Sequence, residues 1–289
     1  MKFIRLKAYG KINLGLDVIR KREDGYHEVR MIMQTVKIFD KIYMEKTQNQ
    51  SISLETNLAY LPVNQNNLMV KAAKLLMEEF QIKEGIQMKL NKFIPVSAGM
   101  AGGSTDAAAV LFGMNRLFHL NLTLEELMQR GVKIGADVPY CLMRGTALAE
   151  GIGEELTRLP NAPQCYVLLA KPAVNVSTRE VYEKLRLDEQ CIHPDIDSII
   201  DGIHRQDIRY MAGVMGNVLE KVTISMHPVI QNIKDKIMEL GAINTLMSGS
   251  GPTVFGLFED SEQALQARDK LRQMNIARQV YITEFFNVG

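Results

Sequence analysis

Residues 95–109 read PVSAGMAGGSTDAAA, and this stretch is the most informative part of the chain for its fold. Three glycines, Gly99, Gly102 and Gly103, stand among small residues directly before an alanine-rich segment of helical periodicity, 104–117. Glycine lets backbone amides turn toward a ligand and lets that ligand approach closely. The start of the following helix adds unpaired N–H groups and the positive end of the helix dipole. The stretch therefore predicts a phosphate-binding loop.

A simpler interpretation of the same stretch is a glycine-rich turn followed by a helix with Ser104 or Asp106 as its N-cap. The small residues that flank the three glycines favour the phosphate loop. The stretch is not a Walker A loop or a Rossmann fingerprint, because neither G-x-x-x-x-G-K-[ST] nor G-x-G-x-x-G occurs in the chain. Protein-kinase signatures are absent as well. A nucleotide site here belongs to another class.

The composition excludes a polyelectrolyte partner. The 289 residues carry 34 Lys and Arg against 33 Asp and Glu, a formal net charge of +1. Binders of nucleic acid or of anionic membranes usually carry a basic excess, so we expect neither partner. Three cysteines without a CxxC pair favour a reducing compartment over a zinc or dithiol site. Neither a signal peptide nor an apolar run of ~20 residues is found, so we expect a cytoplasmic protein.

Periodicity in the first half predicts strands and then helices. Apolar alternation predicts an antiparallel sheet with strands over 7–19, 29–39 and 41–54. Helical spacing predicts helices over 67–80, 104–117 and 124–133. Thr123 and Glu126 form a capping box at the start of the third helix.

The second half predicts alternating helices and strands. Two glycines and two prolines within 151–163 predict a linker, which divides the chain into domains 1–160 and 161–289. The strands predicted beyond it are 165–170, 243–247, 253–258 and 279–285, and the helices are 227–241 and 260–274. The mixture predicts an α+β fold.

Three blocks of the sequence resemble the GHMP superfamily of small-molecule kinases. They are AYGKINLGLDVIRKREDGYHEV (8–29), PVSAGMAGGSTDAA (95–108) with GADVPYC (135–141), and MSGSGPTVF (247–255). Within the superfamily, KINL followed by DGYHE resembles the 4-diphosphocytidyl-2-C-methyl-D-erythritol kinases. Met100 and Ala101 stand where that family often has Leu and Gly, and Thr105 stands where Ser is common. These conservative departures leave the expected activity intact.

The resemblance implies a two-domain fold. An N-terminal nucleotide-binding domain and a C-terminal ferredoxin-like α/β domain would enclose the active site in the cleft between them. The implied reaction transfers the γ-phosphoryl of ATP to the 2-hydroxyl of 4-diphosphocytidyl-2-C-methyl-D-erythritol, in the non-mevalonate isoprenoid pathway. ATP is then the co-substrate and Mg²⁺ the expected metal, with Ser104 or Thr105 as its candidate protein ligands. The oligomeric state is left open.

Three other functions are compatible with parts of the pattern. Another GHMP kinase, acting on homoserine or on a mevalonate-type substrate, is disfavoured by the DGYHE segment. A silent ligand sensor on the same fold is disfavoured by the presence of Lys11 and Asp137. A nucleotide-binding module without transfer chemistry is the third.

The resemblance assigns catalytic roles to Asp137, in GADVP, and Lys11, in GKINL. A carboxylate near the substrate hydroxyl would accept its proton or orient it. An ammonium near that carboxylate would keep it ionised and stabilise charge on the transferred group. On local sequence alone, Asp137 is equally a helix N-cap ahead of Pro139, and Lys11 an exposed strand lysine.

Binding roles follow from the same blocks. Asn13, two residues after Lys11 on the same strand face, would contact the substrate polyol. Tyr26 would stack on the cytosine and His27 would bond its polar edge, unless the two are an ordinary surface pair. Two weaker assignments are Tyr182, as a second aromatic ring, and Thr178. The residues assigned to ATP are Pro95, Val96, Ser97, Ala98, Gly99, Met100, Ala101, Gly102, Gly103, Ser104 and Thr105.

Overall fold

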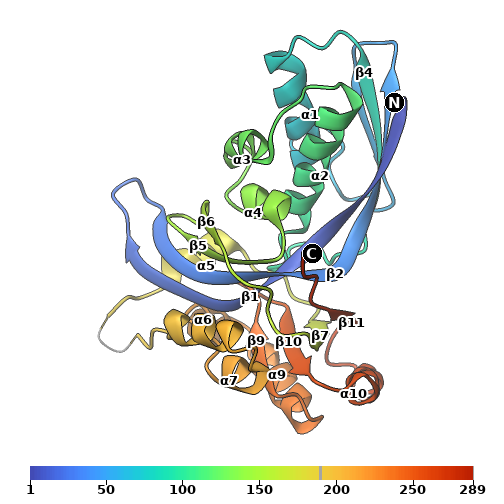
Figure 1. The fold of residues 1–289 in the computed structure, drawn as a ribbon. Coiled ribbons are helices and arrows are strands. Elements are labelled where there is room, and N and C mark those ends of the chain that lie inside the picture. Colours follow the sequence, from blue (N-terminus) through green and yellow to red (C-terminus); the bar gives the residue numbers. More distant parts are fainter. Residues whose placement is uncertain (189–190, 289) are drawn as a thin grey trace. The chain divides into compact units, whose positions relative to one another are not determined.

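The computed structural model of the protein describes residues 1–188 and 191–288 (Figure 1). The chain forms two compact units whose segments interleave along the sequence. Unit 1 comprises Met1–Gly10, Ile38–Val96 and Ala101–Met143, and unit 2 comprises Lys11–Lys37, Ser97–Met100 and Arg144–Gly289.

Two long strands explain the interleaving. Strands β1 (Phe3–Lys21) and β2 (His27–Thr47) each contribute residues to both units. They are neighbours in a sheet of order β3-β4-β2-β1-β8. The compact units therefore do not follow the single division near residue 160, and that division stays a prediction.

Unit 1 combines strands with four helices. Strand β4 pairs antiparallel with β2 and parallel with β3, and α2 contacts both α1 and α4. The elements that lie wholly in this unit are β3 (Ile52–Thr56), α1 (Leu68–Glu79), β4 (Gly85–Asn91), α2 (Gly102–Leu117), α3 (Leu124–Val132) and α4 (Asp137–Met143).

The helices of unit 1 follow the sequence closely. The Asn67 side chain accepts the Met69 N–H at the start of α1. Thr123 and Glu126 form the predicted capping box of α3. Gly113 brings α2 close to β2, because a Cβ at Gly113 would lie 2.4 Å from Met44 Sδ. The three predicted helices of this half are confirmed.

The predicted strand over 41–54 is wrong. β2 runs without a break through Asp40 to Thr47, and β3 is a separate strand that begins at Ile52. Asp40 lies between the two predicted strands, 29–39 and 41–54. It is fully buried inside β2, since its carboxylate accepts hydrogen bonds from other parts of the chain.

The first sheet is mixed rather than antiparallel. In unit 2, β8 (Gly216–Asn217) pairs parallel with β1, and β5 (Thr146–Glu150) pairs antiparallel with β2. β6 (Glu155–Arg158) pairs with β5. The segment 151–163, predicted as a domain linker, contains the strand β6, and its role as a linker stays a prediction. Gly151 and Gly153 lie in the turn before β6, and Pro160 and Pro163 lie in the irregular segment after it.

The C-terminal part of unit 2 is a four-stranded antiparallel sheet of order β11-β7-β10-β9. With α9 and α10 against it, the chain order is β-α-β-β-α-β, which confirms the ferredoxin-like expectation. The elements of this sheet and its two helices are β7 (Tyr166–Lys171), α9 (Val229–Glu239), β9 (Asn244–Met247), β10 (Val254–Phe258), α10 (Ser261–Gln273) and β11 (Gln279–Glu284).

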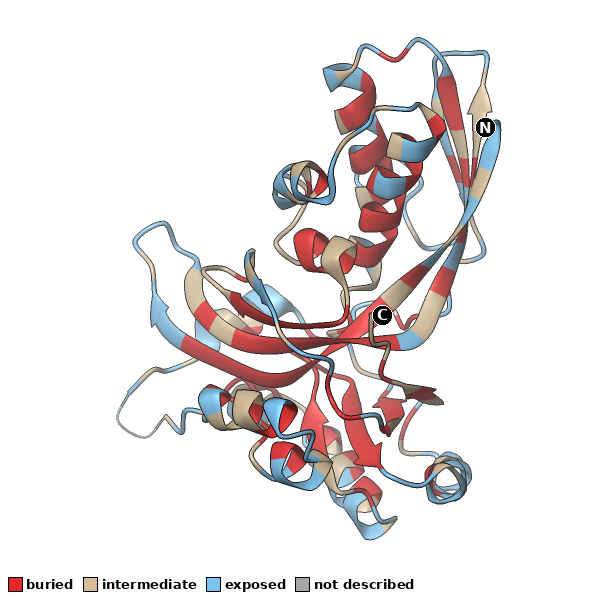
Figure 2. Cartoon of the chain, viewed as in Figure 1, coloured by how far each residue is buried: buried red, intermediate tan, exposed pale blue. Residues whose placement is uncertain are grey.

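The remaining helices of unit 2 are short. They are α5 (Thr178–Lys184), α6 (Ile196–His204), α7 (Ile208–Gly213) and α8 (Glu220–Met226). Buried residues concentrate in the strands and on one face of most helices (Figure 2). Among the described helices, none has the length and apolarity needed to cross a membrane.

Candidate active site

Parts of the three sequence blocks of the resemblance meet in unit 2, namely Lys11 and its neighbours, the loop tip Ser97–Met100 and the third block, whereas 135–141 lies in unit 1. The Lys11 N–H donates to the Met100 carbonyl at 3.2 Å, which joins β1 to the tip of the glycine loop. The Ser248 hydroxyl donates to the Gly99 carbonyl at 2.9 Å, which joins the loop tip to the turn after β9. Gly99 has a φ of +70°, and a Cβ there would lie 2.0 Å from the Ser248 carbonyl oxygen. Only glycine fits this contact.

Lys11 and Asn13 are buried neighbours on β1. Lys11 is 5% exposed, so the alternative of an exposed strand lysine is wrong. Its Nζ donates to Asn13 Oδ1 at 2.7 Å, and Asn13 Nδ2 contacts Met31 Sδ at 3.2 Å. Among the described residues of unit 2, no carboxylate pairs with Lys11. A buried ammonium whose partner is neutral lowers its energy when an anion binds.

His27 and Tyr182 lie together in unit 2. Their ring centroids are 5.0 Å apart at an interplanar angle of 44°, although they come from β2 and α5. Burial, and then the charge of Lys21, lowers the pKa of His27 below its ordinary value. Tyr26 is 60% exposed, so it lies at the surface, as the simpler interpretation allowed.

The Gly249–Gly251 turn is held by residues that carry no sequence motif. Asn217 Nδ2 donates to the Met247 and Gly249 carbonyls, both at 2.8 Å. The Ser250 hydroxyl lies 2.8 Å from the Thr178 hydroxyl, so the weak prediction at Thr178 falls beside the third block. Asn217 was missed because a single asparagine in a two-residue strand has no recognisable spacing.

The glycine loop leads into α2. Pro95 and Val96 follow β4, the tip Ser97–Met100 belongs to unit 2, and Ala101 is the N-cap of α2 with a φ of +53°. No side chain caps this helix, so the proposal of Ser104 or Asp106 as N-cap is wrong.

The two glycines at the start of α2 differ. A Cβ at Gly102 would lie 2.8 Å from Lys92 Nζ, so protein packing alone requires a small residue there. At Gly103, which is exposed, a Cβ would meet only Leu68 Cδ1 at 3.6 Å. Gly103 is therefore the glycine whose missing side chain leaves space for a ligand. Of the two hydroxyl residues that follow, Ser104 is half-buried and Thr105 is 3% exposed.

Asp137 is the first residue of α4 rather than the residue before it, so it is not an N-cap. It is half-buried, and no described residue of its own unit forms a hydrogen bond or ion pair with its carboxylate. Asp137 belongs to unit 1 and Lys11 to unit 2. Their catalytic roles stay predictions.

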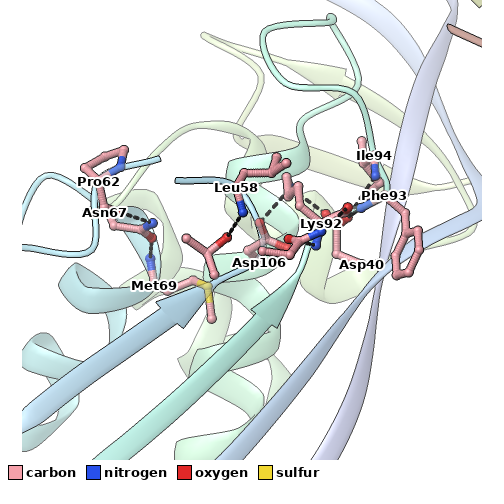
Figure 3. A network of polar contacts seen from close by, with 11 residues as sticks. Asp40, Leu58, Pro62, Asn67, Met69, Lys92, Phe93, Ile94 and Asp106 are labelled. Atoms are coloured by element: carbon pink, nitrogen blue, oxygen red, sulfur yellow. Dashed lines mark hydrogen bonds and ion pairs between the residues drawn. The ribbon is translucent and has the colours of Figure 1, made fainter. Parts of the chain in front are cut away.

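A buried ion cluster in unit 1 was missed entirely. Lys92, directly after β4, lies between the carboxylates of Asp40 on β2 and Asp106 on α2 (Figure 3). Burial raises the pKa of Asp106 well above its ordinary value, and Asp40 adds to this effect while Lys92 opposes it. Burial lowers the pKa of Lys92, but the two carboxylates outweigh it and the net shift is upward. Lys92 is 52 positions from Asp40 and 14 from Asp106 in the sequence, and these separations match no known motif.

Comparison with known proteins identifies the family. The family descriptions "GHMP kinases N terminal domain" and "GHMP kinases C terminal" match residues 67–145 and 199–277. A 4-diphosphocytidyl-2-C-methyl-D-erythritol kinase of Lachnospira eligens is 60% identical over 286 residues, 99% of each chain. The chain belongs to the 4-diphosphocytidyl-2-C-methyl-D-erythritol kinase family. It is a small-molecule kinase of the GHMP fold.

Solved structures agree with membership of the 4-diphosphocytidyl-2-C-methyl-D-erythritol kinase family. A crystal structure of 4-(cytidine 5'-diphospho)-2C-methyl-D-erythritol kinase superimposes with a TM-score of 0.83 at 30% identity, covering 99% of this chain and 100% of that one. A homoserine kinase from Cytophaga hutchinsonii has a TM-score of 0.79 at 17% identity, over 100% of this chain and 95% of that one. The second likeness shows the fold alone.

Proposed function

We propose that this chain transfers the γ-phosphoryl of ATP to the 2-hydroxyl of 4-diphosphocytidyl-2-C-methyl-D-erythritol. The observation that carries the proposal is the 60% identity, along 99% of both chains, to a kinase of that name. The contacts among the three blocks around Lys11 support it, because they bring a buried cation to a backbone loop of the kind that binds phosphate.

The proposed ATP subsite is the loop from Pro95 to Thr105. The start of α2 offers the amides of Gly102 and Gly103, with the positive end of the helix dipole behind them. The exposure of Gly103 supports close approach of a phosphate to the backbone. Ser104 is the more accessible of the two hydroxyl residues and is the proposed hydrogen-bond donor to a phosphate oxygen.

Lys11 is the proposed stabiliser of charge on the transferred phosphoryl group. Its ammonium is buried, and among the described residues of unit 2 it donates to a neutral amide oxygen alone. Such a cation interacts more strongly with developing negative charge than an exposed one, because little water competes. Asn13 orients Lys11, and its own contact with the substrate polyol is a further proposal.

Asp137 is proposed to orient the attacking hydroxyl and to accept its proton. A loose phosphoryl-transfer transition state needs little early deprotonation, so orientation contributes in either case. The accessible carboxylate at the first turn of α4 supports this role. Because Lys11 and Asp137 belong to different compact units, a double-mutant cycle on kcat is the direct test of their cooperation.

The His27–Tyr182 pair is the proposed contact for the cytosine ring. A neutral imidazole offers one donor and one acceptor to the polar edge of a base. The lowered pKa of His27 keeps the ring neutral at pH 7. Tyr182 holds the imidazole in place, and the exposed ring of Tyr26 is free in space to stack on an arriving base.

Mg²⁺ is expected as the partner of ATP. No group of three or more His, Cys, Asp or Glu side chains suited to a metal occurs in residues 1–188 and 191–288. A magnesium ion that is held mainly by the phosphates of ATP needs few protein ligands, and Ser104 is the candidate protein ligand. The ion would neutralise charge on the phosphates. The cytoplasm is the proposed compartment, and Cys141 and Cys165, which are buried and form no disulfide, are compatible with it.

Release of ADP tests the proposed function. The purified protein is incubated with Mg-ATP and, separately, with the cytidyl-diphospho substrate, mevalonate and homoserine. We expect ADP only with the cytidyl compound. ADP release with mevalonate or homoserine, but not with the cytidyl compound, would contradict the proposed substrate. Tight ATP binding without ADP release from any of the three compounds would favour the non-catalytic ligand sensor.

A further inference from the structure

The buried cluster of Lys92, Asp40 and Asp106 joins the two ends of the glycine loop. Lys92 is the first residue after β4, where the loop segment begins, and Asp106 lies in α2, where it ends. Lys92 Nζ donates to Asp106 Oδ2 at 2.7 Å and also to Asp40 Oδ2. The Lys92 ammonium therefore links the residue before the glycine loop to the helix after it, within unit 1.

Asp40 fixes the outgoing backbone as well. Its Oδ1 accepts the Ile94 N–H at 2.8 Å and the Phe93 N–H, the first two amides after Lys92. Asp40 is 0% exposed, so both hydrogen bonds are accepted by a buried carboxylate. One carboxylate thus holds the Lys92 ammonium with one oxygen and, with the other, the two residues that lead into the loop (Figure 3).

The cluster also touches the start of α2 directly. The Lys92 ammonium occupies the space beside Gly102 where a side chain would stand, 2.8 Å from an ideal Cβ. Gly102 is the first residue of α2, so its amide and that of Gly103 are among the unpaired donors of the helix. Their position depends on where Lys92 holds this turn.

One polar atom of the cluster lacks a partner. Asp106 Oδ1 is buried and accepts no hydrogen bond from the described residues. A buried charged cluster with an unsatisfied oxygen costs stability compared with an apolar core, which packs without desolvating charges. The cluster is therefore a poor device for stability alone, and geometry is the advantage that it offers.

We propose that Lys92, held by Asp40 and Asp106, is a positioning residue for phosphoryl transfer, which sets the amides at the start of α2 for the phosphates of ATP. The inference rests on the proposed function, because it assumes that ATP binds at that helix start. It predicts that variants in the cluster raise KM for ATP and leave KM for the second substrate unchanged, because that substrate meets other residues.

Asp106→Leu and Asp106→Asn are the informative pair. Leucine removes the acceptor for Lys92, whereas asparagine keeps one acceptor oxygen in the same place. We expect Asp106→Leu to raise KM for ATP by about tenfold, a change of ~1.4 kcal/mol. We expect Asp106→Asn to stay close to the wild type in both KM values and in kcat. Equal KM values for ATP in the two variants would overturn the proposal.

Ile86→Ala is the matched control for stability. Ile86 is a buried residue of β4 that lies away from the loop, and its truncation creates a cavity. It should lower Tm while KM for ATP stays unchanged. If Ile86→Ala raises KM for ATP as much as Asp106→Leu does, the cluster acts through stability, and the positioning role is wrong.

Gly102→Ala tests the contact between Lys92 and the start of α2, and it can be used if Asp106→Leu fails to fold. The new methyl group would displace the Lys92 ammonium, and KM for ATP should rise. In a Lys92→Met background the ammonium is gone, so the added effect of Gly102→Ala should be smaller. An effect of the same size in both backgrounds would overturn the proposal.

Failure of the proposed function looks different. If the wild type shows no ADP release but binds ATP, and if Asp106→Leu still weakens that binding in calorimetry while Asp106→Asn does not, the positioning role holds and the substrate assignment fails. If the wild type does not bind ATP, both fail.

Discussion

Lys11 and Lys92 are both buried lysines, 5% and 8% exposed, in opposite electrostatic surroundings. Lys92 donates to two carboxylates, those of Asp40 and Asp106. Lys11 donates to the neutral amide oxygen of Asn13. The charge of Lys92 is compensated within the protein, while no described carboxylate of unit 2 compensates that of Lys11, which leaves it for an anion. Burial alone does not separate a structural lysine from a catalytic candidate; the charge of the partner does.

The largest expected effect lies at Asp137, whose carboxylate has no partner in its own unit. Asp137→Asn keeps the size of the side chain but cannot accept a proton. We expect kcat to fall by about 10²–10⁴-fold, since this is the usual contribution of a general base. ATP binding, measured by calorimetry, should be unchanged. Turnover near the wild-type rate would exclude Asp137 as the base.

Lys92→Met tests the comparison of the two lysines through the free energy of unfolding. The variant leaves Asp40 and Asp106 buried without a cation, so we expect a loss of about 3–5 kcal/mol in the free energy of unfolding. Denaturation in urea measures it. Converting both aspartates to asparagine in the same chain should recover part of the loss. A Lys92→Met variant as stable as the wild type would show that the cluster is not a compensated ion group.

Lys11→Met should behave in the reverse manner. We expect kcat to fall by about 10²–10³-fold, the usual effect of removing a preorganised electrostatic donor. The free energy of unfolding should fall less than for Lys92→Met, because only the neutral oxygen of Asn13 loses its donor. If the larger loss is in stability and the smaller in kcat, the distinction between the two lysines fails.

The smallest effect concerns pH and His27. Because burial and the charge of Lys21 lower the pKa of His27, its neutral form persists below the ordinary value of 6.5. Protonation would remove the ring's acceptor. KM for the cytidyl substrate should therefore stay constant as pH falls through 6.5 and rise only below it. Tyr182→Ala exposes the ring, so the rise should then begin nearer 6.5; the same profile in both proteins would contradict this account.

Local patterns predicted the helices α1, α2, α3, α9 and α10 and the four strands of the C-terminal sheet, whereas α5–α8 were not predicted and the ferredoxin-like arrangement followed from the family resemblance. Caps and periodicity lie within a few neighbouring residues, as at Thr123 and Glu126, so local sequence carries the whole signal. The failures involve partners far away along the chain. β2 continues through Asp40 because Lys92 and the amides after it satisfy the carboxylate, and no local pattern contains them.

The candidate site divides in the same way. The sequence blocks predicted which residues to examine, and the structure joins Lys11 to the loop tip, His27 to Tyr182 and Thr178 to Ser250. The two glycines Gly102 and Gly103 look alike in sequence, yet one accommodates Lys92 and the other is open. Asn217 and the ion cluster had no signal at all.

The sequence by itself determined the family and the helices α1, α2, α3, α9 and α10, and it predicted the phosphate loop and the residues worth testing, because these features are encoded by neighbouring residue types. Tertiary structure alone decided which charges are compensated and which glycines face protein. Those properties arise from residues far apart along the chain, such as Gly99 and Ser248, which are 149 positions apart, and they depend on burial, which removes water as an alternative partner.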